Sequence, residues 1–83
     1  MTRRYSDLNT LLRAPVPSAD YISDCRAGRE YGDRVALVMA NTDNPAVLAQ
    51  IAKFHRPEEA GIRAGFFTRM GEHIIANMRS LYR

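Results

Sequence analysis

The sequence predicts an all-α fold, namely a small three-helix bundle with a short additional N-terminal helix. Apolar residues recur at three- and four-residue spacing over most of the chain, and no segment shows the alternating pattern of a β-strand. Prolines and an Asn/Asp-rich segment divide the chain at a few points. The 83 residues are expected to form one domain, 1–83, with a thin core.

Residues 1–17 are predicted to form an N-terminal arm that contains the short helix. Ser6 can cap one or two turns in which leucines share a side. Pro15 and Pro17 then end these turns and impose an extended connection.

The first long helix is predicted over residues 18–40, with Ser18 as the N-cap and Asp20 in the first turn. Its inward face is predicted to contain Tyr21, Cys25, Gly28, Gly32, Val35, Ala36 and Met39. Small residues form a ridge on this face, although each glycine inside a helix costs about 1 kcal/mol relative to alanine. Two interpretations follow: a close crossing with another helix along the ridge, or a helix that is kinked or broken near Gly28 or Gly32.

A second helix is predicted over residues 44–55. Residues 41–45 supply capping side chains and a proline that presets the first helical φ angle. Pro57 ends this short amphipathic helix and makes it an angled or antiparallel neighbour of the next one.

The last helix, predicted over residues 57–81, carries the widest apolar face of the chain. Glu58 and Glu59 suit its first turn, because carboxylates interact favourably with the positive end of the helix dipole. Its apolar side contains Ile62, Phe66, Phe67, Met70, His73, Ile74, Asn77, Met78 and Leu81. This sector covers roughly half of the circumference, whereas about 100° suffices for packing on one neighbour.

The two preceding helices are expected to be too small to cover this apolar sector. The uncovered part, which a second copy or a target protein would contact, is expected to include Phe67, Ile75, Met78 and Tyr82. Aromatic and arginine residues dominate the centres of protein interfaces. The candidate binding residues are therefore Phe66, Phe67, Arg69, Met70, Arg79 and Tyr82. The alternative for the aromatic and methionine members is a place in the core.

Composition and charge limit the possible classes of protein. The net charge of +3 is mild, and all basic residues except Lys53 are arginine. This balance permits either nucleic acid or a protein partner with an acidic surface and demands neither, because charges of both signs alternate along the chain. No signal peptide or membrane span is expected, so the predicted location is the cytoplasm. A chain this small with one cysteine is expected to gain stability as a homodimer.

No set of residues in the sequence converges on a catalytic or metal-binding pattern. His73 is expected to be a hydrogen-bonded core or interface residue, His55 to cap a helix end, and Cys25 to be a small buried hydrophobe. Glu58 and Glu59 are adjacent and point in different directions, which does not suit paired acid and base chemistry. The expectation is a protein that is not an enzyme and uses no cofactor and no metal.

A helix-turn-helix DNA-binding regulator is the first alternative function. The two helices around residues 55–57 could form such a pair, and Arg69, Arg79 and Arg83 lie near one another on the exposed side of the last helix. A recognition helix reads bases from its N-terminal part, and here that part carries Glu58 and Glu59. DNA binding is therefore less favoured.

Three segments of the chain resemble a pattern in short accessory proteins of phages and prophages. They are residues 28–31, the helix start at residues 44–48, and residues 61–67, which contain Gly61 and Gly65. The resemblance covers roughly residues 25–78. It implies a phage-borne protein in the cytoplasm of a bacterial host, of the size of proteins that block host defence by masking a protein surface, anti-CRISPR proteins among them. A basic chain of this kind is expected to dock on an acidic patch rather than to mimic DNA.

The turn at residues 43–45 and the C-terminal residues 74–78 also resemble type III secretion needle subunits, which join two long helices through such a turn. This resemblance implies a filament subunit as the second alternative function. Pro57, the many arginines and the inward Cys25 depart from that family. The favoured hypothesis is a small non-enzymatic protein-binding module that covers a surface of another protein.

Overall fold

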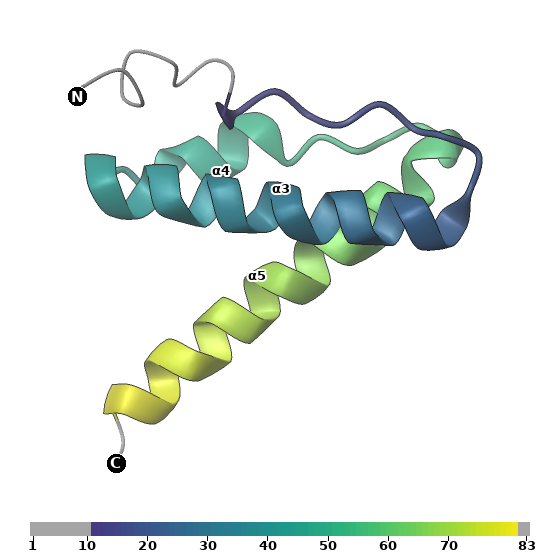
Figure 1. Cartoon of the computed structure of the whole chain (residues 1–83). Coiled ribbons are helices and arrows are strands. Elements are labelled where there is room, and N and C mark those ends of the chain that lie inside the picture. The colour runs from purple at the N-terminus through teal and green to yellow at the C-terminus, as the bar shows by residue number, and fades with distance from the viewer. Residues whose placement is uncertain (1–10, 82–83) are drawn as a thin grey trace, which may run out of the picture.

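The computed structural model describes residues 11–81, with side chains described up to Arg79, and the fold over this range is all-α. Its elements in chain order are α3 (Tyr21–Thr42), α4 (Ala46–Ile51), the one-turn 3-10 helix η1 (Pro57–Glu59) and α5 (Ala60–Leu81). α3 and α5 cross, and the C-terminal half of α5 extends away from the other elements (Figure 1). The predicted helical bundle is confirmed, while the predicted short N-terminal helix lies mainly outside the described residues.

The N-cap of α3 is Asp20. The sequence had suggested Ser18 in this role. The Asp20 carboxylate accepts hydrogen bonds from the backbone N–H of Ile22 (3.2 Å) and from the hydroxyl of Ser23 (2.8 Å). Ser18 instead donates its backbone N–H and its hydroxyl to Asp24, at 3.0 and 2.7 Å. These bonds satisfy a buried carboxylate. The helix therefore begins three residues later than predicted.

The inward face of α3 is rotated relative to the predicted one. Its buried residues are Asp24, Gly28, Tyr31, Gly32, Val35 and Val38. Tyr21 is exposed and Cys25 is half-buried, so the inward placement of Tyr21 was wrong. The predicted face differs from the observed one because Asp24 is buried. A carboxylate is not expected in a core unless a partner such as Ser18 offsets the free-energy cost of its burial through hydrogen bonds. Its burial turns the inner sector toward Tyr31.

The second predicted helix is shorter than expected, because α4 ends at Ile51 and not at residue 55. The backbone leaves the helical region at Ala52, which has φ −83° and ψ 62°. Phe54 thereby turns into the core beside Tyr31, and its carbonyl oxygen accepts a hydrogen bond from Arg63 Nη1 at 2.9 Å. Aromatic burial at Phe54 outweighs the two or three helical hydrogen bonds that a longer α4 would make.

The last helix forms in two parts, with Pro57 at the first position of η1 and α5 continuing from Ala60. Glu59 accepts a hydrogen bond from the backbone N–H of Arg56 at 3.1 Å, which caps this start. The predicted acidic first turn is confirmed.

α3 and α5 cross at a contact formed by glycines. A side-chain carbon at Gly28 would overlap the carbonyl oxygen of Ile62, and one at Gly65 would overlap that of Cys25. Only a hydrogen atom fits at these two positions, so the two backbones touch. α3 continues unbroken through Gly28 and Gly32. The predicted close crossing is confirmed, and the alternative of a helix broken there is wrong.

The core lies around this crossing and toward α4. It consists of Tyr31, Val35, Val47, Phe54, Ile62, Phe66 and Met70. Tyr31, Phe54 and Phe66 form its centre, with ring centroids 5.4 to 6.3 Å apart. The Tyr31 hydroxyl donates a 2.6 Å hydrogen bond to the carbonyl oxygen of Leu12, so the N-terminal segment is held along α3. Burial raises the pKa of the Tyr31 hydroxyl.

Candidate binding groove

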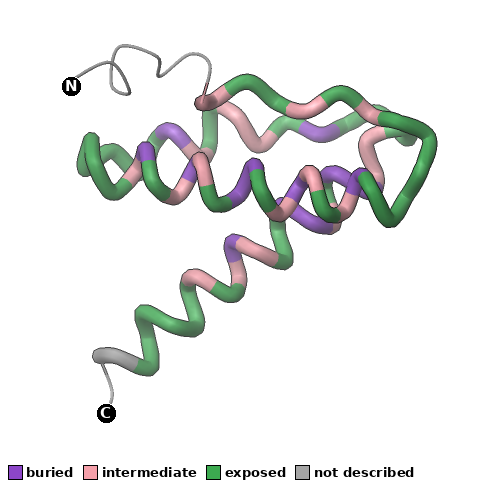
Figure 2. Tube along the Cα trace, in the orientation of Figure 1, coloured by how far each residue is buried: buried purple, intermediate pink, exposed green. Residues whose placement is uncertain are grey.

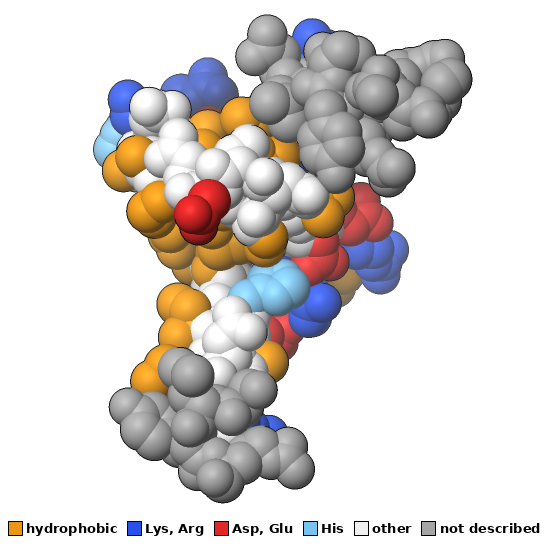
Figure 3. Space-filling model, turned by 90° about the vertical axis from the view of Figure 1, so that its left-hand side faces the viewer, with side chains coloured by type: hydrophobic (Ala, Val, Ile, Leu, Met, Phe, Trp, Pro, Cys, Tyr) orange, Lys and Arg blue, Asp and Glu red, His pale blue; other side chains and the backbone are white. Residues whose placement is uncertain are grey.

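A groove lies between the C-terminal halves of α3 and α5, where the two helices diverge from their crossing. It has a volume of about 860 Å³. Its lining residues are Asp33, Ala36, Leu37, Met39, Ala40, Asp43, Asn44, Pro45, Leu48, Met70, His73, Ile74 and Asn77. Figure 3 looks toward it from the C-terminal end of α3 and shows hydrophobic side chains on the underside of the bundle and on one side of the departing helix.

The groove is apolar along its walls and acidic at two points. Leu37 and Ala40 on α3 face Ile74 on α5 across it. Asp33 lies on α3 near the crossing, where Arg69 and His73 bind its carboxylate, and Asp43 ends the same helix with φ 54° and has no ion pair with a described residue. Among the described lining residues there is no lysine or arginine. The groove therefore suits an apolar ligand that carries positive charge.

α5 projects from the bundle past its crossing with α3; residues 74–81 are here called the extension, and its residues Ile74 and Asn77 also line the groove. Figure 2 shows that it is exposed on all sides in its described part. Ile74, Ile75 and Met78 are 60%, 55% and 41% exposed. Apolar side chains so close together on a projecting helix indicate a contact surface.

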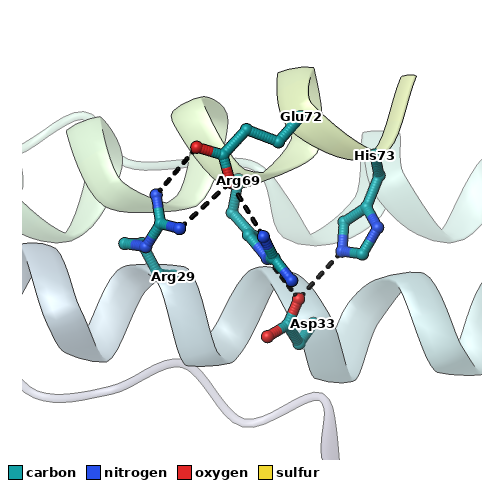
Figure 4. Close-up of polar contacts among 5 residues, drawn as sticks. All are labelled: Arg29, Asp33, Arg69, Glu72 and His73. Carbon is teal, nitrogen blue, oxygen red and sulfur yellow. Dashed lines mark hydrogen bonds and ion pairs between the residues drawn. The ribbon is translucent and has the colours of Figure 1, made fainter. Parts of the chain in front are cut away.

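A charge network borders the groove and joins α3 to α5 (Figure 4). It consists of Arg29 and Asp33 from α3 and Arg69, Glu72 and His73 from α5. Arg69 donates to Asp33 (2.6 Å) and to Glu72 (2.8 Å), and Arg29 donates two hydrogen bonds to Glu72, at 3.0 and 3.2 Å. His73 Nε2 lies 2.8 Å from the same Asp33 oxygen. These contacts hold the angle between the two groove walls.

The charge network lowers the pKa of its carboxylates. Hydrogen bonding from Arg69, followed by that from His73, outweighs desolvation and lowers the pKa of Asp33. Hydrogen bonds from Arg29 and then Arg69 lower the pKa of Glu72. The carboxylates of Asp33 and Glu72 raise the pKa of Arg69 in return. The carboxylates of Asp33 and Glu72 are therefore ionised at neutral pH, and their ion pairs link α3 to α5.

The structure separates the six candidate binding residues. Phe66 is fully buried in the core, so its assignment to a binding surface is corrected, whereas Met70, 6% exposed, belongs to the core and also lines the groove. Phe67 is 45% exposed but packs edge-to-face on Phe54 and Phe66, with centroid distances of 6.3 and 5.0 Å. α5 packs against both α3 and Phe54 at these three residues, so this part of its apolar sector makes contacts within the chain.

The other three candidates lie elsewhere. Arg69 is held in the charge network. Arg79 is exposed on the extension. Tyr82 lies outside the described residues. The expected uncovered face is confirmed for Phe67, Ile75 and Met78, all of which are exposed.

Sequence reasoning missed the α3 wall of the groove. Leu37 is 52% exposed, and Ala40 is exposed beside it. The signal was available, because residues 35–40 are apolar without interruption, and a helix that is apolar all round has more than one apolar contact surface. Ile74 was recognised as apolar but not as a groove residue, because its partners on α3 are far away in sequence.

The arrangement around Pro57 differs from a helix-turn-helix pair. α4 has six residues, an irregular segment separates it from η1, and Gly61 in the first turn of α5 packs against Tyr21 and Asp24 of α3. One side of the N-terminal part of α5, the part that would have to enter a DNA groove, thus packs against α3, while Glu58 of η1 and Arg63 of α5 are exposed. The arrangement also differs from that expected for a needle subunit, in which two long helices are joined by one turn. Here α3 and α5 cross at their glycines.

The Asp33–His73 pair has the spacing of a general base with its orienting carboxylate. Among the described groove residues, however, there is no serine, threonine, cysteine or lysine to act as a nucleophile. Within residues 11–81 no three His, Cys, Asp or Glu side chains are grouped to hold a metal ion. No described helix is both long and apolar enough to cross a membrane.

Comparisons of the chain with protein-family models, with curated proteins and with solved structures gave no match.

Proposed function

We propose that this protein is a non-enzymatic protein-binding module whose groove binds an amphipathic helix of a partner protein. The observation that carries the proposal is the groove itself: two diverging helices with exposed Leu37 and Ile74 on facing walls. An amphipathic helix that lays its apolar face between two helices is a common mode of peptide recognition. The space of about 860 Å³ lies in the usual range for ligand sites.

Charge defines the kind of helix that fits. Asp43 places a carboxylate at the C-terminal end of the α3 wall, while Asp33 at the other end is already bound by Arg69 and His73, and the described lining residues carry no arginine or lysine. A bound helix with basic residues beside its apolar stripe complements this pattern. The net charge of the chain had permitted an acidic partner surface, but the groove favours a basic one, and the local charges act at shorter range.

The arginines support protein binding over DNA binding. Arg29, Arg56 and Arg69 form ion pairs with glutamate or aspartate. Arg34 and Arg63 donate to backbone carbonyl groups. Such side chains are less available to phosphates than free ones. By covering a helix of its partner, the module would act through the surface masking that the resemblance to phage proteins implies, with a host protein as the target.

Selection from a display library of 18-residue helical peptides tests this function. Selected peptides are expected to share an apolar stripe at three- and four-residue spacing and to carry lysine or arginine. Ala40→Arg adds bulk and positive charge to the groove wall and is expected to weaken their binding at least about tenfold. Ala49→Arg is the matched control, because Ala49 is exposed on α4 and outside the groove.

Peptide binding that Ala40→Arg and Ala49→Arg weaken equally would contradict the groove as the site. Failure to select any helical peptide would contradict the function. Tight binding of duplex DNA that weakens steeply with salt would favour the DNA-binding alternative.

A further inference from the structure

The extension exposes one continuous apolar sector, with Ile74 and Ile75 at its two edges. Ile74 lines the groove of its own chain. Ile75, the next residue, is turned about 100° around the helix axis, and it does not line that groove. Both are more than half exposed, and the described part of the chain covers neither. With Met78 between them on the helix surface, they form one apolar sector of about 100°, which can contact both walls of a groove between two diverging helices.

The groove and the extension match in length. At about 1.5 Å per residue, the α3 wall from Asp33 to Asp43 is about 15 Å long, and the extension, residues 74–81, is about 12 Å long. An extension of the same sequence would therefore occupy most of the groove of a second copy.

The groove and the extension also match in charge. The described groove residues include the carboxylate of Asp43 and no lysine or arginine, whereas the carboxylate of Asp33 is already bound by Arg69 and His73. The sequence from Ile74 onward contains Arg79 and no aspartate or glutamate. The chain therefore carries, in its own extension, the apolar and basic helix that the groove requires.

We propose that two copies of the chain form a two-fold symmetric dimer in which the extension of each copy lies in the groove of the other. This inference rests on the proposed function, since it takes the groove to be a helix-binding site and names its occupant. In this dimer the open ends of the two grooves face each other. Each extension enters the groove of the other copy, so that the two extensions lie side by side between the two α3 helices. The contact is isologous, as in most homodimers.

The exposed residues fit this layered arrangement. The side of the extension that carries Ile74 faces the extension of the second copy. The adjoining edge of the apolar sector, with Ile75, faces the α3 wall of the second copy at Leu37 and Ala40. Arg79 lies four residues after Ile75, on the same side, and therefore faces α3 of the second copy. Every apolar side chain of the extension that the single chain leaves exposed gains a neighbour.

Light scattering on the full chain tests the dimer with two single variants. Ile75→Asp places a carboxylate on the extension, and Ala40→Arg obstructs the groove. Each is expected to raise the dimer dissociation constant at least about tenfold and to give a monomer mass at concentrations where the native chain is a dimer. Ile22→Asp and Ala49→Arg are the matched controls, because both positions are exposed and outside the groove and extension. Circular dichroism checks that every variant is folded.

Mixing the two variants separates reciprocal exchange from other dimers. The Ile75→Asp copy retains an intact groove, and the Ala40→Arg copy retains an intact extension, so one native contact can form between them. The mixture is expected to regain dimer mass that neither variant shows alone. A monomeric native chain, a dimer that survives either variant, or a mixture that stays monomeric would each overturn the proposal.

The library-selected peptides distinguish this result from the proposed function. A native chain that is monomeric but binds these peptides through Ala40 would refute the dimer and retain the groove as a helix-binding site. A dimer with the expected mutational pattern and no peptide binding would confine the groove to self-association and refute binding of a separate partner.

Discussion

The backbone of Gly65 in α5 lies directly against the carbonyl group of Cys25 in α3. A side-chain carbon at Gly65 would overlap the Cys25 oxygen and lie 2.8 Å from the carbonyl carbon. Gly28 meets Ile62 in the same way from the other helix. This reciprocal contact sets the distance between α3 and α5 and thus the position from which the groove walls diverge.

Gly65→Ala is expected to lower the free energy of unfolding by about 1–3 kcal/mol, because the added methyl group must push two backbones apart. Gly71→Ala is the control, since no heavy atom lies within 4 Å of the position that its methyl group would occupy. That change is expected to raise the free energy of unfolding by about 0.5–1 kcal/mol through helix propensity. Urea denaturation measures both. Equal effects at the two glycines would contradict the backbone contact.

Ala19→Gly is expected to stabilise the protein by about 0.5–1 kcal/mol. Ala19 has φ 69°, a left-handed conformation that costs a non-glycine residue roughly 1–2 kcal/mol, and glycine adopts it without that cost. The greater freedom of glycine in the unfolded chain offsets part of the gain. Ala14→Gly, in the same connection but without positive φ, is expected to give no stabilisation. Thermal unfolding compares the two variants, and a lower melting temperature for Ala19→Gly would refute the strain.

Asp33→Asn is expected to reduce the loss of stability in acid. Hydrogen bonding from Arg69 lowers the pKa of Asp33 below its ordinary value of 3.8. A carboxylate with a lower pKa in the folded state contributes stability above its unfolded pKa and loses it as pH falls through the folded pKa. The contribution is at most about 1 kcal/mol, because the Asp33 side chain is half exposed and ion pairs at such sites are screened.

Urea midpoints of the native chain and of Asp33→Asn, measured between about pH 7 and pH 2, check this dependence. The difference in urea midpoint between the native chain and Asp33→Asn is expected to shrink as pH falls. Asp43→Asn serves as a control, since Asp43 has no ion pair with a described residue. A difference that stays constant with pH would show that the Asp33 ion pair is not responsible.

Phe66→Ala is expected to lower the free energy of unfolding by about 3–5 kcal/mol, because Phe66 is fully buried between Tyr31 and Phe54. Phe67→Ala, at the half-exposed neighbouring position, is expected to cost clearly less. Chemical denaturation of the two variants tests the assignment of Phe66 to the core. A loss at Phe66 no greater than that at Phe67 would return Phe66 to the list of surface candidates.

Several features of the fold could be predicted because they depend on neighbours in sequence. The break at Pro57 and the acidic first turn at Glu58 and Glu59 follow from local backbone chemistry. The small-residue ridge of α3 indicated a close crossing, because a helix carries glycine at a cost. The wide apolar sector of the last helix indicated an exposed face, which Ile75 and Met78 show.

The misassigned residues depend on contacts between distant segments. Asp24 is buried because Ser18 meets it after a turn at Ala19, and this contact rotates the inner face of α3. Phe54 leaves its predicted helix because a place between Tyr31 and Phe66 is open to it. Phe66 was placed on a binding surface because a helical wheel shows which side is apolar but not which part of that side meets a neighbour.

The sequence by itself determined the helical class, the boundary at Pro57 and the presence of more apolar surface on the last helix than one neighbour needs, since periodicity and backbone preferences are local properties. Only the tertiary structure decided how that surface is divided. The glycine crossing holds α3 and α5 together at one end and lets them diverge at the other. Phe66 is therefore enclosed, while Leu37 and Ile74 face each other across an open groove.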